Sequence, residues 1–161
     1  MPASPPVIDV EIASDDGTVP SIGEITDWVR RALDAVPQPP QDAELAVRVV
    51  DAQEMRSLNC EHRQKDVPTN VLSFPIGEIQ GLPAAAGNFL GDIVVCAPVV
   101  RREAAEQGKP LNDHWAHMLV HGALHLLGYD HQVDSEAAKM EALEQRVLAQ
   151  HGVSNPYRAS S

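Results

Sequence analysis

The chain has 161 residues, of which 43% are hydrophobic and 22% are charged, a composition that fits one globular domain with a substantial core. Its net charge of −11 argues against a protein that coats nucleic acid or an anionic membrane by bulk charge. Cys60 and Cys96 form no paired motif, so neither a disulfide framework nor a thiolate zinc site is expected. Without a secretory signal over residues 1–10 or an apolar run of the ~18 residues that span a bilayer, the expected location is the cytoplasm.

The N-terminal part of the chain predicts a strand, a helix and a second strand. Apolar residues alternate with acidic ones over residues 7–12, which is typical of a half-buried strand. Ser21 and Glu24 have the spacing of a capping box, which predicts a helix that runs to about Val36. Alternation returns over residues 45–50, where a second strand is expected.

The middle of the chain predicts a short helix and two more strands. Asp51 is expected to cap the helix, and a loop is expected from about residue 60 to residue 69. Strands are predicted over residues 71–74 and 89–96, separated by an excursion over residues 77–87 that is rich in glycine and alanine.

The C-terminal part of the chain predicts helices over residues 98–107, 112–127 and 135–150. Strands and helices mixed in this way indicate an α+β fold, an α/β-type sandwich in which a small mixed sheet packs against several helices. A single domain is expected over residues 1–161, with residues 1–6 and 152–161 loosely ordered.

Histidines are concentrated in one segment, since five of the seven lie between His114 and His131. On a helix, His114, His117, His121 and His125 would share one stripe, because their spacings are three, four and four. A single histidine on such a stripe is more often a packing residue than a ligand. The whole run from 121 to 131, HGALHLLGYDH, is harder to attribute to packing alone.

This run has the spacing of a catalytic zinc site. His121 and His125 are one helical turn apart, a rise of about 6 Å, so both imidazoles can aim at one ion. Gly128 is expected to end the helix with a positive φ and reverse the chain, which lets His131 supply a third ligand. The frame is that of the metzincin site, and three imidazoles suit one Zn²⁺ per chain with a fourth position left for water. His117 and His121 form a rival pair that lacks a following glycine turn.

One residue of the metallopeptidase pattern is missing. The sequence HExxH places the general base directly after the first histidine, and Gly122 occupies that position here. A zinc metallopeptidase is therefore a less favoured alternative, as is a metal-binding module without catalysis.

The run HGALHLLGYDH resembles the signature of the YbeY family, metal-dependent bacterial endoribonucleases. Other segments of the chain are similar to that family as well, namely residues 59–63, 66–75, 91–93 and 140–144. Asn70 departs from the resemblance, because the family usually has aspartate there.

The resemblance implies a single-strand-specific, zinc-dependent endoribonuclease that acts in 16S rRNA 3′-end maturation and ribosome quality control. It implies that His121, His125 and His131 hold the zinc, whose bound water would be acidified. It also implies that Arg63 stabilises the charge that develops on the phosphodiester, a role that suits a guanidinium. Without the resemblance, Arg63 would be interpreted as a surface residue paired with Glu61 or Asp66.

The expected partners are RNA and the ribosome, with no DNA and no membrane. The acidic balance limits the affinity for free RNA, because contacts to phosphates need cations. The ribosome or ribosomal proteins are therefore expected to supply much of the targeting. The cations that could line an RNA channel are Arg56, Arg63, Lys65, Arg101, Arg102 and Lys109.

Overall fold

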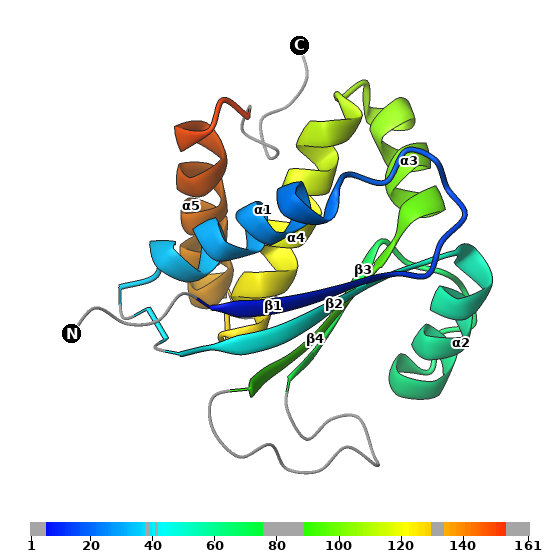
Figure 1. Cartoon of the computed structure of the whole chain (residues 1–161), viewed down its shortest axis with the longest axis horizontal. Helices are drawn as coiled ribbons and strands as arrows, with labels where there is room; N and C mark the ends of the chain where they lie inside the picture. The colour runs from blue at the N-terminus through cyan, green and yellow to red at the C-terminus, as the bar shows by residue number, and fades with distance from the viewer. Residues whose placement is uncertain (1–5, 38, 41, 76–88, 130–133, 154–161) are drawn as a thin grey trace.

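The computed structural model describes residues 6–37, 39–40, 42–75, 89–129 and 134–153. Four strands and five helices occur in these ranges (Figure 1). In chain order they are β1 (Val7–Ile12), α1 (Ile22–Ala35), β2 (Glu44–Val50), α2 (Ala52–Arg63), β3 (Val71–Pro75), β4 (Phe89–Cys96), α3 (Ala97–Gln107), α4 (Leu111–Leu126) and α5 (Asp134–Gln150). No helix among the described residues is long and apolar enough to cross a membrane.

The strands form one mixed sheet in the order β1-β2-β4-β3. β1, β2 and β4 are parallel, whereas β3 pairs with β4 in the antiparallel direction. The predicted α+β architecture with a small mixed sheet is confirmed. β3 is an edge strand in this order, and its outer side becomes important for the site described below.

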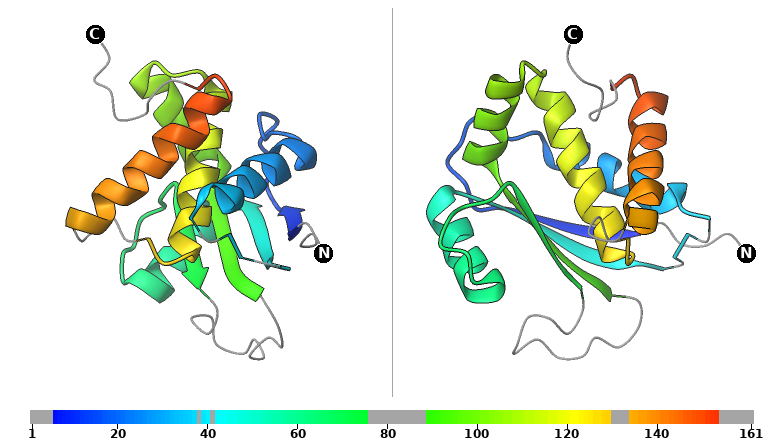
Figure 2. Two further views of the ribbon diagram at one scale, coloured as in Figure 1. Left: turned by 90° about the vertical axis from the view of Figure 1, so that its left-hand side faces the viewer. Right: turned by 180° about the vertical axis from the view of Figure 1, so that it is seen from behind.

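The two faces of the sheet pack against different helices. Apolar side chains from β2 and β4 pack on one face against α1, α4 and α5, and include Leu45, Val47, Val49, Ile93 and Val95. On the opposite face, a second cluster joins the sheet to α2 and α3, and includes Val50, Met55, Phe74, Val94, Cys96 and Val99. Figures 1 and 2 show α1, α4 and α5 gathered on one side of the sheet and α2 apart from them.

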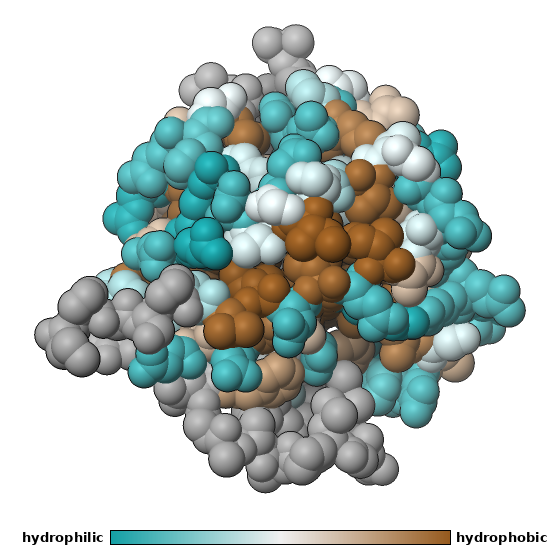
Figure 3. Space-filling view, in the orientation of Figure 1, coloured by the Kyte–Doolittle hydropathy of each residue, from teal (hydrophilic) through white to brown (hydrophobic). Residues whose placement is uncertain are grey.

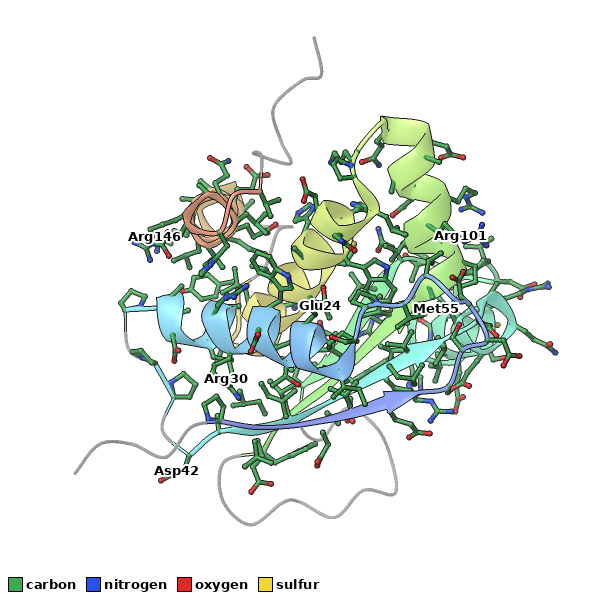
Figure 4. The ribbon with its side chains drawn as sticks, turned by 45° about the horizontal axis from the view of Figure 1, so that its top comes forward. Glu24, Arg30, Asp42, Met55, Arg101 and Arg146 are labelled. Carbon is green, nitrogen blue, oxygen red and sulfur yellow. The ribbon has the colours of Figure 1, made fainter. Side chains whose placement is uncertain are left out.

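Helix α1 begins as the sequence predicts. The Ser21 hydroxyl accepts a hydrogen bond from the amide of Glu24 at 3.1 Å, and the Glu24 carboxylate accepts one from the amide of Ser21 at 3.3 Å. This capping box satisfies amides that the first turn leaves without partners. Figure 4 shows Glu24 in the first turn and Arg146 on α5. The Arg146 guanidinium donates to the carbonyl of Ala35 at 2.6 Å and so joins α5 to the end of α1.

The predicted end of α2 is wrong, because the helix continues to Arg63 instead of giving way to a loop near Cys60. Gln64 ends it in the left-handed conformation, with φ at 57°, and the amide of Lys65 reaches the carbonyl of Asn59 at 3.2 Å. This arrangement closes the last turn of a helix. Arg63 is therefore held on a helix end and not on a loop.

The cap predicted at Asp51 is only partly correct. Asp51 is the N-cap residue of α2, but its side chain makes no hydrogen bond to the helix. Its carboxylate instead accepts hydrogen bonds from the Ser14 hydroxyl and from the amide of Asp15. The side chain thus ties the segment after β1 to the start of α2.

The remaining predicted elements agree with the structure to within a residue or two. Pro98 lies in the first turn of α3, and Gly128 follows α4 with φ at 99°, as predicted for the reversal. The excursion predicted over residues 77–87 lies outside the described residues, as do residues 1–5 and 154–161 of the predicted termini. Val153 is buried against the core, and its amide donates to the carbonyl of Leu148.

Hydrophobic side chains also gather on the surface, over α1 and β1 near the middle of the face shown in Figure 3. Ile12 at the end of β1 and Ile22 at the start of α1 are 39% and 54% exposed. This apolar area lies on β1, at the opposite edge of the sheet from β3.

Candidate active site

A cleft of about 530 Å³ lies beside the edge strand β3, between α2 and α4. We call it the β3 cleft, and its lining residues are Asn59, Arg63, Lys65, Thr69, Asn70, Val71, Leu72, Ser73, His117, Met118, His121 and His125. Three of the four predicted site residues, Arg63, His121 and His125, therefore line one cleft. The fourth, His131, lies outside the described residues.

The predicted histidine stripe is present on α4. Neighbouring ring centroids are 6.2 Å apart for His114 and His117, 6.1 Å for His117 and His121, and 6.3 Å for His121 and His125. Burial changes along the stripe, since His114 and His117 are buried while His121 and His125 are half-buried. His121 and His125 are therefore the rings of the stripe that are most open to a ligand in the cleft, which His117 also lines.

Glu144 of α5 is the residue of this site that the sequence analysis missed. It is fully buried, and its two carboxylate oxygens accept hydrogen bonds from His117 Nε2 at 2.6 Å and from His121 Nδ1 at 3.1 Å. Ligand atoms of these three residues lie within 4.8 Å of one another, so the group could hold a metal ion. A signal for Glu144 exists in the sequence, because it interrupts an apolar stripe with helical spacing that includes Met140, Leu143, Val147 and Leu148.

The histidines keep Glu144 ionised. Burial raises the pKa of this carboxyl, but the hydrogen bonds and charges of His117 and His121 outweigh burial and lower the pKa to about 2. An ionised carboxylate only accepts hydrogen bonds. A ring nitrogen that makes a hydrogen bond with an ionised carboxylate is the donor of that bond.

Arg63 is held at the cleft by main-chain and aromatic contacts. Its guanidinium donates to the carbonyls of His62 and Ser73, each at 3.1 Å, and lies over the ring of Phe74 at 5.1 Å from the centroid. The carbonyl of Ser73 belongs to the outer edge of β3, so the guanidinium covers part of that edge. Asp66, one of the two acids that could pair with a surface arginine at position 63, accepts two hydrogen bonds from Arg56, at 2.8 and 2.9 Å.

Of the six candidate RNA-binding cations, two line the β3 cleft, and Arg56, Arg101 and Arg102 form ion pairs elsewhere. Arg63 and Lys65 line the β3 cleft. Arg56 is paired with Asp66, and Arg101 on α3 (Figure 4) is paired with Asp16 at 2.9 Å. Among the described residues of the cleft lining, Arg63 and Lys65 are the lysine and arginine side chains.

Asn70 lies in a network at the other end of the histidine stripe. Its side-chain amide donates to both oxygens of Glu103, at 3.1 and 3.3 Å. Glu103 also makes a hydrogen bond with His114 Nε2 at 2.9 Å. Burial lowers the pKa of His114, and this effect outweighs the opposing contribution of Glu103. An amide at position 70 can donate to Glu103, which an ionised aspartate cannot do.

Comparison with known proteins identifies the family. The family model described as Endoribonuclease YbeY matches residues 10–152. The chain belongs to this family. Proteins named Endoribonuclease YbeY are 65% identical over 115 residues in Halorhodospira halophila (71% of this chain and 75% of the relative) and 52% identical over 154 residues in Cellvibrio japonicus (96% and 84%). In Alcanivorax borkumensis, the identity is 49% over 153 residues (94% and 86%).

A solution structure of a protein from Thermotoga maritima supports the fold. It matches with a TM-score of 0.58 and 23% sequence identity, and the match covers 94% of this chain and 99% of the other. At this identity the likeness shows the fold alone.

The segments that resemble the YbeY family come together in space. Residues 59–63 form the end of α2, residues 71–75 form β3, and residues 121–126 form the end of α4. All three contribute to the lining of the β3 cleft. Residues 140–144 lie on α5, where Glu144 contacts His117 and His121 of α4. The predicted membership of the YbeY family is confirmed.

Gly122 shows why this site lacks the base of the metallopeptidases. A Cβ atom at this position would lie 2.8 Å from Cγ2 of Ile93 and 3.4 Å from the Ser73 hydroxyl oxygen. That hydroxyl donates to the carbonyl of Gly122 at 2.9 Å. Position 122 thus faces the sheet at close range. Side chains of the sheet fill the space that a glutamate at this position would need.

Proposed function

We propose that this chain is a metal-dependent endoribonuclease that cleaves single-stranded RNA in the β3 cleft. The observation that carries the proposal is the meeting of Arg63 from α2 with His121 and His125 from α4 in one cleft. Membership of a family whose members are named endoribonucleases supports the same activity. The biological role that we propose is 16S rRNA 3′-end maturation and ribosome quality control in the cytoplasm.

The proposed metal ligands are His121, His125 and His131, with one Zn²⁺ per chain. The donor set fits this ion, because imidazoles one turn apart at the end of α4 reach the cleft and Gly128 has the positive φ that the reversal toward position 131 needs. When bound, the ion would supply a Lewis acid that polarises the phosphodiester and activates water.

The proposed role of Arg63 is to stabilise the charge that develops on the phosphoryl oxygens. The planar guanidinium offers five N–H donors, and the Ser73 carbonyl and the Phe74 ring hold it in place at the cleft. A guanidinium that is already positioned does not have to be reorganised when charge develops, which is the condition for strong electrostatic stabilisation.

The charge distribution supports a modest affinity for free RNA. Arg63 and Lys65 are cationic residues of the cleft lining, while the whole chain carries a net charge of −11. A protein that makes few contacts to phosphates binds RNA weakly, and its affinity depends little on the salt concentration. The ribosome or ribosomal proteins are the partners that we propose for targeting.

The test compares three substrates: a labelled single-stranded RNA, the same RNA annealed to its complement, and an unstructured protein. Each is incubated with and without a chelator, and metal is added back at the end. We expect cleavage of the single strand alone, its loss with chelator, and its recovery with Zn²⁺. Cleavage of the protein substrate would favour the peptidase alternative, and stoichiometric metal without any cleavage would favour a non-catalytic metal-binding module.

A further inference from the structure

We propose that Glu144 is a positioning residue, which holds the His121 ring by its Nδ1–H group so that Nε2 is the atom that binds the metal. The inference rests on the proposed role of His121 as a ligand. It adds a residue from α5, which the predicted ligand set does not include.

The hydrogen bonds to Glu144 leave it little freedom. One carboxylate oxygen accepts from His121 and the other from His117, so rotation of the carboxylate would break both bonds. The residue is fully buried, which removes the competition of water for these bonds. A carboxylate that binds the second nitrogen of a ligand imidazole fixes its tautomer and orientation and increases its basicity.

The neighbourhood of Glu144 fixes the carboxylate relative to α4. Met140, Leu143, Val147 and Leu148 surround it on the same face of α5 and belong to the main core cluster. Because core side chains are closely packed, α5 presents the carboxylate at one position along the histidine stripe. His117 thereby acts as the second anchor of Glu144, one turn before His121 on α4.

The same three residues could instead ligate a metal directly, but the distances favour hydrogen bonding. Two ligand atoms of one tetrahedral zinc are ~3.3 Å apart, given Zn–N and Zn–O distances near 2.0–2.1 Å. The His117 Nε2 and Glu144 Oε2 atoms are 2.6 Å apart, which is a hydrogen-bond distance between charged or polar groups. The full burial of Glu144 would also keep such an ion away from a substrate in the cleft.

The first experiment needs no variant. Long-range ¹H–¹⁵N correlation spectra of the metal-free protein at pH 8, with His121 assigned by comparison with His121→Gln, report which ring nitrogen carries the proton. We expect a proton on Nδ1 of His121. An unprotonated Nδ1 would overturn the inference, because Glu144 could then not hold that nitrogen as a donor.

The second experiment measures metal affinity in Glu144→Gln, which keeps the size of the side chain and removes its charge. Competition with a chromophoric chelator gives the Kd for Zn²⁺, and the visible spectrum of the Co²⁺-loaded protein reports the ligand field. We expect a Kd for Zn²⁺ that is ~10–100-fold weaker, with one ion per chain still bound at saturation and a shifted Co²⁺ spectrum. The matched control is Glu141→Gln, one turn earlier on α5 and not part of the cleft lining, for which we expect the wild-type Kd and spectrum.

Two results would overturn the inference. An unchanged Kd and Co²⁺ spectrum in Glu144→Gln would show that the carboxylate does not act on the ligand. Complete loss of stoichiometric metal in both Glu144→Gln and His117→Gln, with melting temperatures near wild type, would show direct ligation by these residues.

The readouts separate this inference from the proposed function. Weakened metal binding in Glu144→Gln together with an Nδ1 proton on His121 would support the positioning role, even if the wild-type protein cleaved no RNA. Conversely, metal-dependent RNA cleavage by the wild type with an unchanged Kd in Glu144→Gln would keep the function and reject the positioning role.

Discussion

The two walls of the β3 cleft are built differently. On the α4–α5 side, buried side chains from two helices hold one another through His117, Glu144 and His121. On the α2–β3 side, Arg63 is held by main-chain carbonyls and by the ring of Phe74. A substitution on the first side therefore changes the orientation of its neighbours, whereas a substitution of Arg63 removes one donor group and leaves the backbone that held it.

The largest effect is expected from His125→Ala, which removes a proposed ligand from the α4 wall. We expect loss of stoichiometric metal and of RNA cleavage with a melting temperature near wild type, because His125 is only half-buried. Elemental analysis of the purified protein measures the metal. His151→Ala, at an exposed position beyond α5, is the control and should keep its metal. Full metal in His125→Ala would move the site toward His117, His121 and Glu144.

Arg63→Ala removes the guanidinium from the α2–β3 side of the cleft. We expect a loss of roughly 2.7–4 kcal/mol of barrier stabilisation, about a hundred- to a thousandfold in rate, if the guanidinium acts on developing charge. Arg63→Lys should recover only part of the rate, because lysine keeps the charge and loses the fork of donors. Single-turnover cleavage of RNA measures the rate, and metal content should stay at the wild-type level in both variants. A wild-type rate in Arg63→Ala would remove Arg63 from the mechanism.

Gly122→Ala tests how closely the α4 wall must approach the sheet. The new methyl group would lie 2.8 Å from Cγ2 of Ile93, a buried and β-branched side chain that has little room to rotate. We expect a loss of about 1–3 kcal/mol in the free energy of unfolding, as is typical of overpacking. Urea unfolding measures it. The matched control is Gly23→Ala in α1, where the nearest atom is 3.9 Å away, and a gain of up to about 1 kcal/mol is expected there. Equal effects at both positions would contradict the close approach.

The smallest effect is expected at the far end of the stripe, from Asn70→Asp. A carboxylate at position 70 would face Glu103 and raise the pKa of one or both acids above the unfolded value. The variant should lose roughly 1 kcal/mol of stability at pH 7, and the loss should shrink as the pH falls through the raised pKa, where one acid becomes protonated. Protonation of His114, favoured by the added charge, would act in the same direction. Urea unfolding between pH 7 and pH 5 measures the trend, and Asn70→Ala should show a loss that changes less with pH.

The elements that the sequence predicted best are those with strong local signals. The capping box at Ser21 and Glu24 and the positive φ at Gly128 depend on a few neighbouring residues, and both are present. The predicted end of α2 was wrong because the helix is closed by Gln64 in the left-handed conformation. Glutamine rarely adopts this conformation, so the sequence does not indicate it.

In the candidate site, too, the residues with a local sequence signal were predicted and those that depend on distant contacts were not. The histidine stripe was predictable because its period is the period of one helix, and the resemblance to the YbeY family supplied Arg63. Glu144 was missed because its partners lie on another helix, although its place in an apolar stripe marked it as a buried charge that needs partners. The sequence also showed that Gly122 lacks a side chain, but the reason is the distance to Ile93 across the sheet.

The position of β3 at the edge of the sheet has a consequence for association between chains. An exposed edge strand offers its main-chain groups to strands of other molecules, and proteins block such pairing with short strands, prolines and charges. β3 has five residues, ends at Pro75, and has the Arg63 guanidinium on the carbonyl of Ser73. A strand from another molecule that pairs with this edge would have to displace the guanidinium. Arg63, which we propose to act on the phosphodiester, would therefore also oppose aggregation by strand addition at β3.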